Sequence, residues 1–217
     1  MYKRQRQDIQ IHFVSLDRTP ELWAKLEQDD ITLREACGNT VRNITASAIA
    51  GIDPKEPFDV SPYADAMFRY FLRSAHCQEL GRKIKIAFSS SADDDALTFI
   101  HDLGFIPQIL IREGREIRGF KIVIGGGLGA QPIPAKTAHE FLEEDRIIPF
   151  TEAVIRTFDR YGERQNRNKA RLKYLVQKLG LEKFIELVKE EYIAIKTQSF
   201  AIAYKACLLY TSDAADE

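Results

Sequence analysis

The chain has 217 residues, of which 45% are hydrophobic and 29% charged, and its formal net charge is −1. This composition is typical of a soluble globular protein, no apolar run approaches the ~20 residues of a membrane span, and no secretion signal opens the chain. Three irregularly spaced cysteines indicate a reducing compartment rather than a disulfide framework. We therefore expect a cytoplasmic protein without a membrane partner.

The two termini look like inverted copies of one DNA element. The first five residues, MYKRQ, can be encoded by GTG TAT AAG AGA CAG. The reverse complement of that string, read one base in, encodes CLLYT, which is Cys207 to Thr211. Transposase adapters leave such scars, which are excluded from fold reasoning. We assign 1–5 and 207–217 to adapter scars, expect them to be unpacked, and take the remainder as an interior fragment of a longer protein.

The first third of the chain carries one strand pattern and three helix patterns. RQDIQIHFV, residues 6–14, alternates polar and apolar side chains, which predicts a half-buried strand. Thr19 as cap and a proline in the first turn predict a short helix, PELWAKLEQ. A second helical region is expected over 32–50, and a third helix begins with Ser61 as its cap.

Mixed patterns continue through the rest of the chain. RKIKIAFS predicts a strand, and ADDDALTFIHDLG, residues 92–104, predicts a helix whose aspartates suit its positive start better than a metal. IPQILIREGREIRGFKIVIGG predicts two strands joined by a turn around Gly114. Further helices are expected near 136–144, 149–161, 168–179 and 181–192. This order predicts an α+β (mixed α/β) fold with a mixed β-sheet of about three to five strands flanked by helices.

Lys83 and Lys85 stand out within the strand RKIKIAFS. Alternate residues of a strand share a face, so the two ammonium stems leave about 6–7 Å apart while Ile84, Ile86 and Phe88 face a core. Two like charges held side by side repel each other unless an anion lies between them. The pair therefore indicates an anion site, with a solvated strand face as the alternative.

A glycine run, GGGLGA, occupies Gly125 to Ala130 and formally fits the dinucleotide pattern G-x-G-x-x-A. That pattern needs a helix opening at its second glycine, and Pro132 and Pro134 argue against one. The bare backbone would instead let a flat ring approach closely, with amides free to bind acid groups.

The remaining polar residues point to no other class of site. A basic run from Arg156 to Lys178 predicts a solvated helical face or a polycarboxylate site. It lacks interleaved aromatic residues and the chain is nearly neutral, so we expect no nucleic-acid partner. The four histidines show no metal-ligand spacing, and no metal site is assigned.

Six motifs together carry a resemblance to one family: RQDIQIHFV, REACGNTVRNIT, PFDVSPYA, RKIKIAF, GFKIVIGGGLGA and YGERQNRNKARLKYLVQKLG. In this order, from Arg6 to about Val188, they resemble the sirohaem-dependent nitrite and sulfite reductases. The resemblance implies that residues 6–36 are the C-terminal part of a ferredoxin-like half-domain. It further implies a sirohaem-binding α/β domain at 37–192 and a linker at 193–206.

The resemblance also implies roles for individual residues. It places Arg42, Lys83 and Lys85 at the substrate anion as catalytic residues. It assigns sirohaem contacts to Arg6, Gln10, Asn43, Gly126 and Gly127. Sirohaem carries eight carboxylates, so a neutral protein must concentrate cations to bind it, and reduction of the anion needs positive charge and proton donors at the departing oxygens. We therefore expect Arg42, Lys83 and Lys85 to converge on one pocket that faces the loop at 125–129.

The implied function is that of a fragment of a sirohaem and iron–sulfur oxidoreductase, which reduces sulfite to sulfide or nitrite to ammonia with six electrons. Family members hold a 4Fe-4S cluster with C-x5-C and C-x3-C pairs, which Cys37 and Cys77 do not match. We therefore expect Cys37 to be a small buried side chain and the cluster to depend on a missing C-terminal half. The incomplete chain should be inactive alone.

Three points stay open at this stage. Two lysines suit a dianion, which favours sulfite over nitrite, and the electron donor is a ferredoxin or a flavoprotein. Two other functions remain as alternatives: a non-catalytic anion- or tetrapyrrole-binding module, and a nicotinamide-dependent oxidoreductase.

Overall fold

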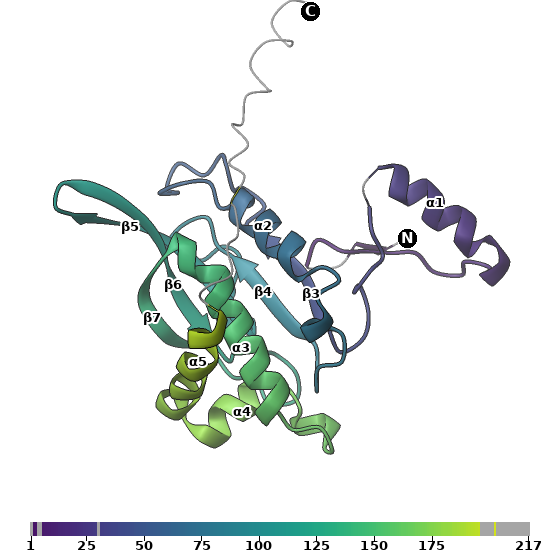
Figure 1. The fold of residues 1–217 in the computed structure, drawn as a ribbon. Helices are drawn as coiled ribbons and strands as arrows, with labels where there is room; N and C mark the ends of the chain where they lie inside the picture. Colours follow the sequence, from purple (N-terminus) through teal and green to yellow (C-terminus); the bar gives the residue numbers. More distant parts are fainter. Residues whose placement is uncertain (1, 4–5, 30, 196–201, 203–217) are drawn as a thin grey trace, which may run out of the picture.

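A five-stranded mixed sheet with the order β3-β4-β5-β6-β7 forms the centre of the molecule (Figure 1). The computed structural model describes residues 2–3, 6–29, 31–195 and 202. The strands are β3 (Val41–Ala46), β4 (Ile84–Phe88), β5 (Leu103–Arg112), β6 (Arg115–Ile124) and β7 (Lys136–Glu143). β3, β4 and β5 are parallel, whereas β5, β6 and β7 run antiparallel. The expected mixed sheet is thus confirmed.

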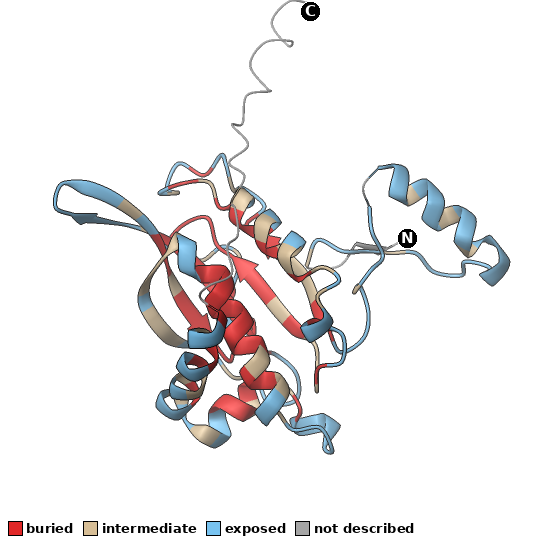
Figure 2. Cartoon of the chain, viewed as in Figure 1, coloured by how far each residue is buried: buried red, intermediate tan, exposed pale blue. Residues whose placement is uncertain are grey.

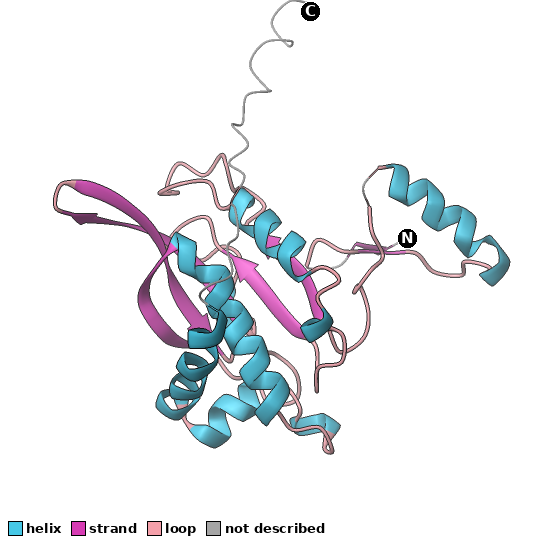
Figure 3. Ribbon diagram, in the orientation of Figure 1, coloured by secondary structure: helices cyan, strands magenta, loops and turns pink. Residues whose placement is uncertain are grey.

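Helices pack against this sheet and against one another (Figure 3). They are α2 (Ser61–Phe71), α3 (Ile147–Tyr161), α4 (Leu172–Leu179) and α5 (Leu181–Ile195). Buried residues gather in the central strands and in α3 (Figure 2), which is buried almost continuously from Ile147 to Phe158. The helices expected at 149–161, 168–179 and 181–192 are confirmed, although α4 begins only at Leu172, after a 3-10 turn at Arg167–Lys169.

An aromatic cluster joins α2 to the middle strands. Phe120 of β6 meets Phe58 edge-on at 5.4 Å and Tyr63 at 5.1 Å between ring centroids, and Phe88 stacks on Phe105 at 4.6 Å. Edge-on and offset pairs of this kind stabilise a core beyond the area that they bury. One face of β4 is therefore committed to the core, and its other face is left for the polar site.

The predicted turn around Gly114 is confirmed as the tip of a long β5–β6 hairpin (Figure 1). Glu113 and Gly114 both have positive φ, at 52° and 75°, as a two-residue hairpin turn of the favoured hand requires.

The helical region expected over 32–50 is wrong, because its centre is β3. Val41, Ile44 and Thr45 are β-branched, and they pair in parallel with Ile84, Ile86 and Ala87 of β4. Pairing with a buried neighbour outweighs the weak helical pattern of the sequence.

The helix expected over 92–104 is also wrong. Only a 3-10 turn at Thr98–Ile100 forms, because Asp94 and Leu97 have positive φ and so interrupt any helix. The Asp95 carboxylate accepts hydrogen bonds from the hydroxyls of Ser47 and Ser89 instead of capping a helix.

The helix expected over 136–144 is a strand, β7, which pairs antiparallel with β6 from Gly119↔Glu143 to Ile124↔Lys136. The open edge of β6 has backbone groups that need partners, and β7 satisfies them. The helix and strand propensities of residues 136–144 carry no information about the unpaired backbone groups of β6.

The N-terminal segment departs from expectation in length and burial. RQDIQIHFV forms only β2 (Ile9–Gln10), and Ile9 and Phe13 are 60% and 105% exposed. The predicted half-buried strand is wrong, since no described residue covers its apolar face. The predicted helix is confirmed as α1 (Thr19–Gln28) with a proline in its first turn, but Arg18 rather than Thr19 holds the cap position.

Ser61 likewise begins α2 without capping it, because Val60 holds the cap position and Asp59 accepts the Ser61 N–H at 2.8 Å.

The expectation for the termini is tested only in part. β1 (Tyr2–Lys3) pairs antiparallel with β2, so this part of 1–5 is not free of contacts. The segment 207–217 and most of the expected linker lie outside the described residues, and 193–195 belong to α5. Among the described helices, none is both long and apolar enough to cross a membrane.

Candidate anion-binding site

The alternation predicted for β4 is confirmed. Ile84, Ile86 and Phe88 are fully buried, whereas Lys83, just before the strand, and Lys85, within it, are half-buried on the other side. The strand therefore separates an apolar core from two ammonium groups at its start.

Both lysines lie in a field of other cations. Burial lowers the pKa of Lys83, and the charges of Arg42, Arg82 and Arg171 lower it further. Burial also lowers the pKa of Lys85, followed by the charges of Arg6, Lys83 and Arg171. We call these residues the cation cluster: Arg6, Arg42, Arg82, Lys83, Lys85 and Arg171. Asp102 is the acidic group that opposes the shift in both lysines.

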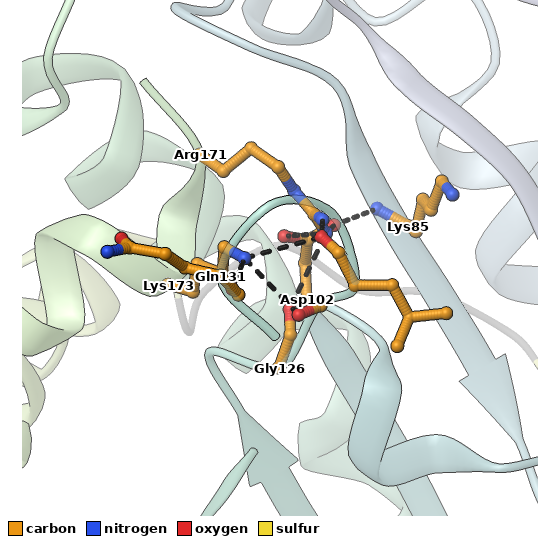
Figure 4. A network of polar contacts seen from close by, with 8 residues as sticks. Lys85, Asp102, Gly126, Gln131, Arg171 and Lys173 are labelled. Carbon is orange, nitrogen blue, oxygen red and sulfur yellow. Dashed lines mark hydrogen bonds and ion pairs between the residues drawn. The ribbon is translucent and has the colours of Figure 1, made fainter. Parts of the chain in front are cut away.

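Asp102, immediately before β5, is the acidic partner of this cluster. Its side chain is fully buried, and Nη2 of Arg171 contacts both carboxylate oxygens, at 2.9 and 3.0 Å (Figure 4). The backbone N–H of Lys85 donates to Oδ2 at 3.0 Å. Burial raises the pKa of Asp102, and Arg171 and this N–H oppose the rise. Arg171 and this N–H therefore favour the ionised form of the carboxylate.

Arg171 links Asp102 to the glycine run. It donates from Nη1 to the Leu128 carbonyl at 3.1 Å and from Nη2 to the Gly126 carbonyl at 3.5 Å. A Cβ on Gly127 would lie 2.5 Å from Nη1 of Arg171, so this glycine makes room for the guanidinium. The run returns through a bridge between Gly127 and Ile133 without opening a helix, which supports the argument against a dinucleotide fold.

Gly126 is required by the backbone around it. A Cβ there would lie 2.4 Å from the Phe99 carbonyl oxygen and 2.6 Å from that of His101. The space that the two glycines leave is therefore filled by the chain itself. A ring that approaches this loop would meet main-chain atoms rather than vacated side-chain space.

Arg6 ties the N-terminal segment to the sheet. It donates from Nη2 to the carbonyls of Asn43 at 2.6 Å and Ile86 at 3.0 Å, and the Asn43 amide donates back to the Arg6 carbonyl. Burial lowers the pKa of Arg6 to about 10. Its Nε and Nη1 are buried and have no hydrogen-bond partner among the described residues. Gln10 lies half-buried in β2.

Arg42 approaches the cluster from β3. Its guanidinium donates to the carbonyls of Gly38 at 3.1 Å and Ala36 at 2.6 Å, and its charge acts on Lys83. A hollow beside Arg42 and Asn43 is lined by neither Lys83 nor Lys85. The structure thus groups Lys83 and Lys85 with Asp102 and with Arg171, which contacts the glycine loop from the start of α4, and it leaves Arg42 at the margin of the group.

Sequence reasoning missed Asp102 and Arg171. Arg171 was one of many cations in a basic run interpreted as a solvated helical face or a polycarboxylate site, and its side chain is only 17% exposed. An aspartate directly before an apolar strand was the available signal, because a buried carboxylate needs a cationic partner. Cys37 was expected to be buried and is exposed, whereas Cys77 is buried. The turn around Cys37 lies at the surface before β3, where no described residue encloses it.

His101 directly precedes Asp102 in the sequence, is buried, and feels the charges of the cation cluster. Its Nδ1 lies 2.8 Å from the Leu97 carbonyl oxygen. Burial, followed by the charge of Arg6, lowers its pKa to about 4. The described ranges hold no group of three or more His, Cys, Asp or Glu residues that could ligate a metal.

Comparisons with known proteins agree on one family. The model of the nitrite and sulphite reductase 4Fe-4S domain matches residues 37–196. Sulfite reductase (ferredoxin) 1 of Mycolicibacterium paratuberculosis is 34% identical over 188 residues, covering 87% of this chain and 33% of that protein. The assimilatory ferredoxin-dependent nitrite reductase of Haloferax mediterranei is 31% identical over 196 residues, covering 89% and 33%.

A solved structure gives the same result. The NirA protein of Mycobacterium tuberculosis superposes with a TM-score of 0.74 at 30% identity, covering 82% of this chain and 32% of that one. The chain spans about a third of the length of the curated relatives that it matches. With the family model matched across most of its length, the chain belongs to the nitrite and sulphite reductase 4Fe-4S domain family.

Proposed function

We propose that this chain is the first-half fragment of a sirohaem and 4Fe-4S oxidoreductase that reduces sulfite or nitrite. The observation that carries the proposal is the cation cluster: six basic residues from four segments of the chain lie in one field, with the buried Asp102 as the acidic group that opposes them. Such an excess of positive charge is costly unless an anionic ligand offsets it. In this reading, residues 6–36 belong to a ferredoxin-like half-domain and 37–192 to the sirohaem-binding domain.

The residues present fit a ligand with several carboxylates. Nε and Nη1 of Arg6 and Nε of Arg171 are buried without hydrogen-bond partners among the described residues, and unpaired buried donors are costly until a ligand accepts from them. Sirohaem would supply the iron that binds the anion and carries electrons to it. Arg6, Gln10 and Asn43 would hold its carboxylates, and Gly126 and Gly127 would lie against it through their main chain.

Arg42, Lys83 and Lys85 would bind the substrate anion, and the two lysines would protonate it. Arginine gives a permanent charge, and lysine a charge that can also release a proton. The lowered pKa values of Lys83 and Lys85 favour that release. Two lysines balance a dianion better than a monoanion, so we propose sulfite as the preferred substrate.

The electron donor and the cluster belong to the whole enzyme. Relatives that share this domain are named as ferredoxin-dependent sulfite and nitrite reductases, so we propose a ferredoxin as donor. The 4Fe-4S ligands would come from a C-terminal half, since neither Cys37 nor Cys77 of this chain has the required spacing.

Turnover by the complete enzyme, with reduced methyl viologen as donor, tests the proposal. Arg42→Gln and Lys83→Gln should each lower kcat/KM for both anions by about ten- to a hundredfold, because a charge-assisted contact is lost. Lys178→Gln is the matched control, since it removes one charge from an exposed position on α4. If the cluster variants keep wild-type turnover, or no anion is reduced, the proposal is wrong.

A further inference from the structure

Lys173 is a buried lysine on the first turn of α4 that the proposed chemistry does not use. It is only 2% exposed. Its Nζ lies 3.2 Å from the Gly127 carbonyl oxygen, 3.3 Å from that of Leu128 and 2.5 Å from that of Gln131 (Figure 4). A lysine ammonium has three donors, so this set of main-chain acceptors uses all of them.

Arg171, two residues before Lys173, donates hydrogen bonds to the same loop, at the carbonyls of Gly126 and Leu128. The carbonyls of 126, 127, 128 and 131 therefore all turn toward two cations at the start of α4. Figure 4 shows both side chains reaching the loop from the helix side.

This arrangement sets the direction of two backbone amides. In a trans peptide the carbonyl and the following N–H point to opposite sides, so inward carbonyls at 127 and 128 turn the amides of Leu128 and Gly129 away from α4. Within the described chain neither amide donates a backbone hydrogen bond to another residue. Leu128 is 57% exposed, and Gly129 has φ +119°, a conformation that other residues rarely adopt.

We propose that Lys173 is a positioning residue whose ammonium locks the loop at 126–131 so that the Leu128 and Gly129 amides face a carboxylate ligand. Outward successive amides are a common anion-binding device. The locking role stands on the contacts alone. The identity of the carboxylate as one of sirohaem rests on the proposed function.

Amide hydrogen exchange on the purified chain tests the locking role without any ligand. The Gly127 and Ile133 amides bond to each other's carbonyls at 2.9 and 3.0 Å and report on loop order. In Lys173→Met, which keeps the length and removes the charge, these two amides should exchange at least about tenfold faster. The Ser47 amide, bonded to Phe88 at the far end of β4, should keep its wild-type rate.

A second variant covers the case in which Lys173→Met does not fold. Lys173→Ala leaves a space lined by three carbonyls, and millimolar methylammonium should restore slow exchange at Gly127 and Ile133. Unchanged exchange at these amides, a uniform acceleration that includes Ser47, or no rescue by methylammonium would each overturn the locking role.

Sirohaem titration tests the ligand role. Lys173→Met should bind sirohaem about tenfold more weakly than wild type and than Lys178→Gln, and sirohaem should protect the Leu128 and Gly129 amides from exchange. Wild-type affinity in Lys173→Met, or no protection at these amides, would overturn this role. If wild type binds no sirohaem while the loop loosens in Lys173→Met, the locking role stands and the proposed function fails.

Discussion

Replacing Arg171 with glutamine removes the cation that pairs with the buried Asp102 carboxylate. The Asp102 side chain is fully buried and that of Arg171 is only 17% exposed. After the change, the backbone N–H of Lys85 remains as a hydrogen-bond donor to the carboxylate. Breaking a buried pair by removing one partner typically costs about 3–5 kcal/mol.

Protonation of the Asp102 carboxylate sets an upper limit on this cost, because a neutral carboxyl group needs no cationic partner. At pH 7, protonation costs about 4 kcal/mol for a group with an unfolded pKa near 3.9. The free energy of unfolding should therefore fall by about 3–4 kcal/mol at pH 7. In the variant the folded pKa of Asp102 lies far above the unfolded value, so the folded state binds more protons and the penalty shrinks by about 1.4 kcal/mol per unit of falling pH.

Urea unfolding followed by far-ultraviolet circular dichroism, at pH 7 and at pH 5, measures both effects. Lys183→Gln is the control, because the Lys183–Glu186 pair is 57% and 62% exposed and its loss should leave the free energy of unfolding close to that of wild type. A loss below about 1 kcal/mol for Arg171→Gln at pH 7, or the same loss at both pH values, would refute the reasoning about Asp102.

Three other changes test separate parts of the account. The pKa of His101 is lowered to about 4, so its contribution to stability is full above pH 6.5 and is lost as the pH falls toward 4. In His101→Asn, the free energy of unfolding measured in urea should therefore change by up to about 3 kcal/mol less between these pH values. The same pH dependence in the variant and in wild type would contradict this. Gly126→Ala forces a Cβ to 2.4 Å from the Phe99 carbonyl oxygen and should cost about 1–3 kcal/mol in the same assay, whereas Leu128→Ala on the exposed part of the loop should cost less than about 0.5 kcal/mol. In the complete enzyme, Lys85→Asn should lower sulfite turnover by about ten- to a hundredfold and leave nitrite turnover within a few-fold, and equal losses would sink the sulfite preference.

The parts of the fold that sequence predicted well are those with a strong local signal. The alternation around Ile84 and Ile86, the turn at Gly114 and the helices α2, α3 and α5 all formed as expected. The failures at β3 and β7 share one cause. Both segments are strands because a neighbouring strand needs a partner, and that need lies far away in the sequence.

The residues of the candidate site show the same difference between local signals and contacts set by distant parts of the chain. Lys83 and Lys85 were visible because two lysines alternate with buried isoleucines in one short strand. Arg171 and Lys173 were not, because their helix carries other basic residues that remain in solvent, such as Lys178. Only the fold shows that Arg171 reaches Asp102 and that Lys173 reaches the glycine loop.

Sirohaem binding by the purified chain is the most direct test of the claim that the cation cluster binds a polycarboxylate macrocycle. Visible absorption would follow titrations of wild type, of Arg6→Gln, and of the control Lys178→Gln. We predict that wild type and the control bind alike and that Arg6→Gln binds about ten- to a hundredfold more weakly, since one charge-assisted contact contributes about 1.5–3 kcal/mol. Binding should also weaken as salt rises and should be tighter for sirohaem than for haem b, which has two carboxylates. Equal affinity of Arg6→Gln and wild type, or haem b bound as tightly as sirohaem, would contradict the claim.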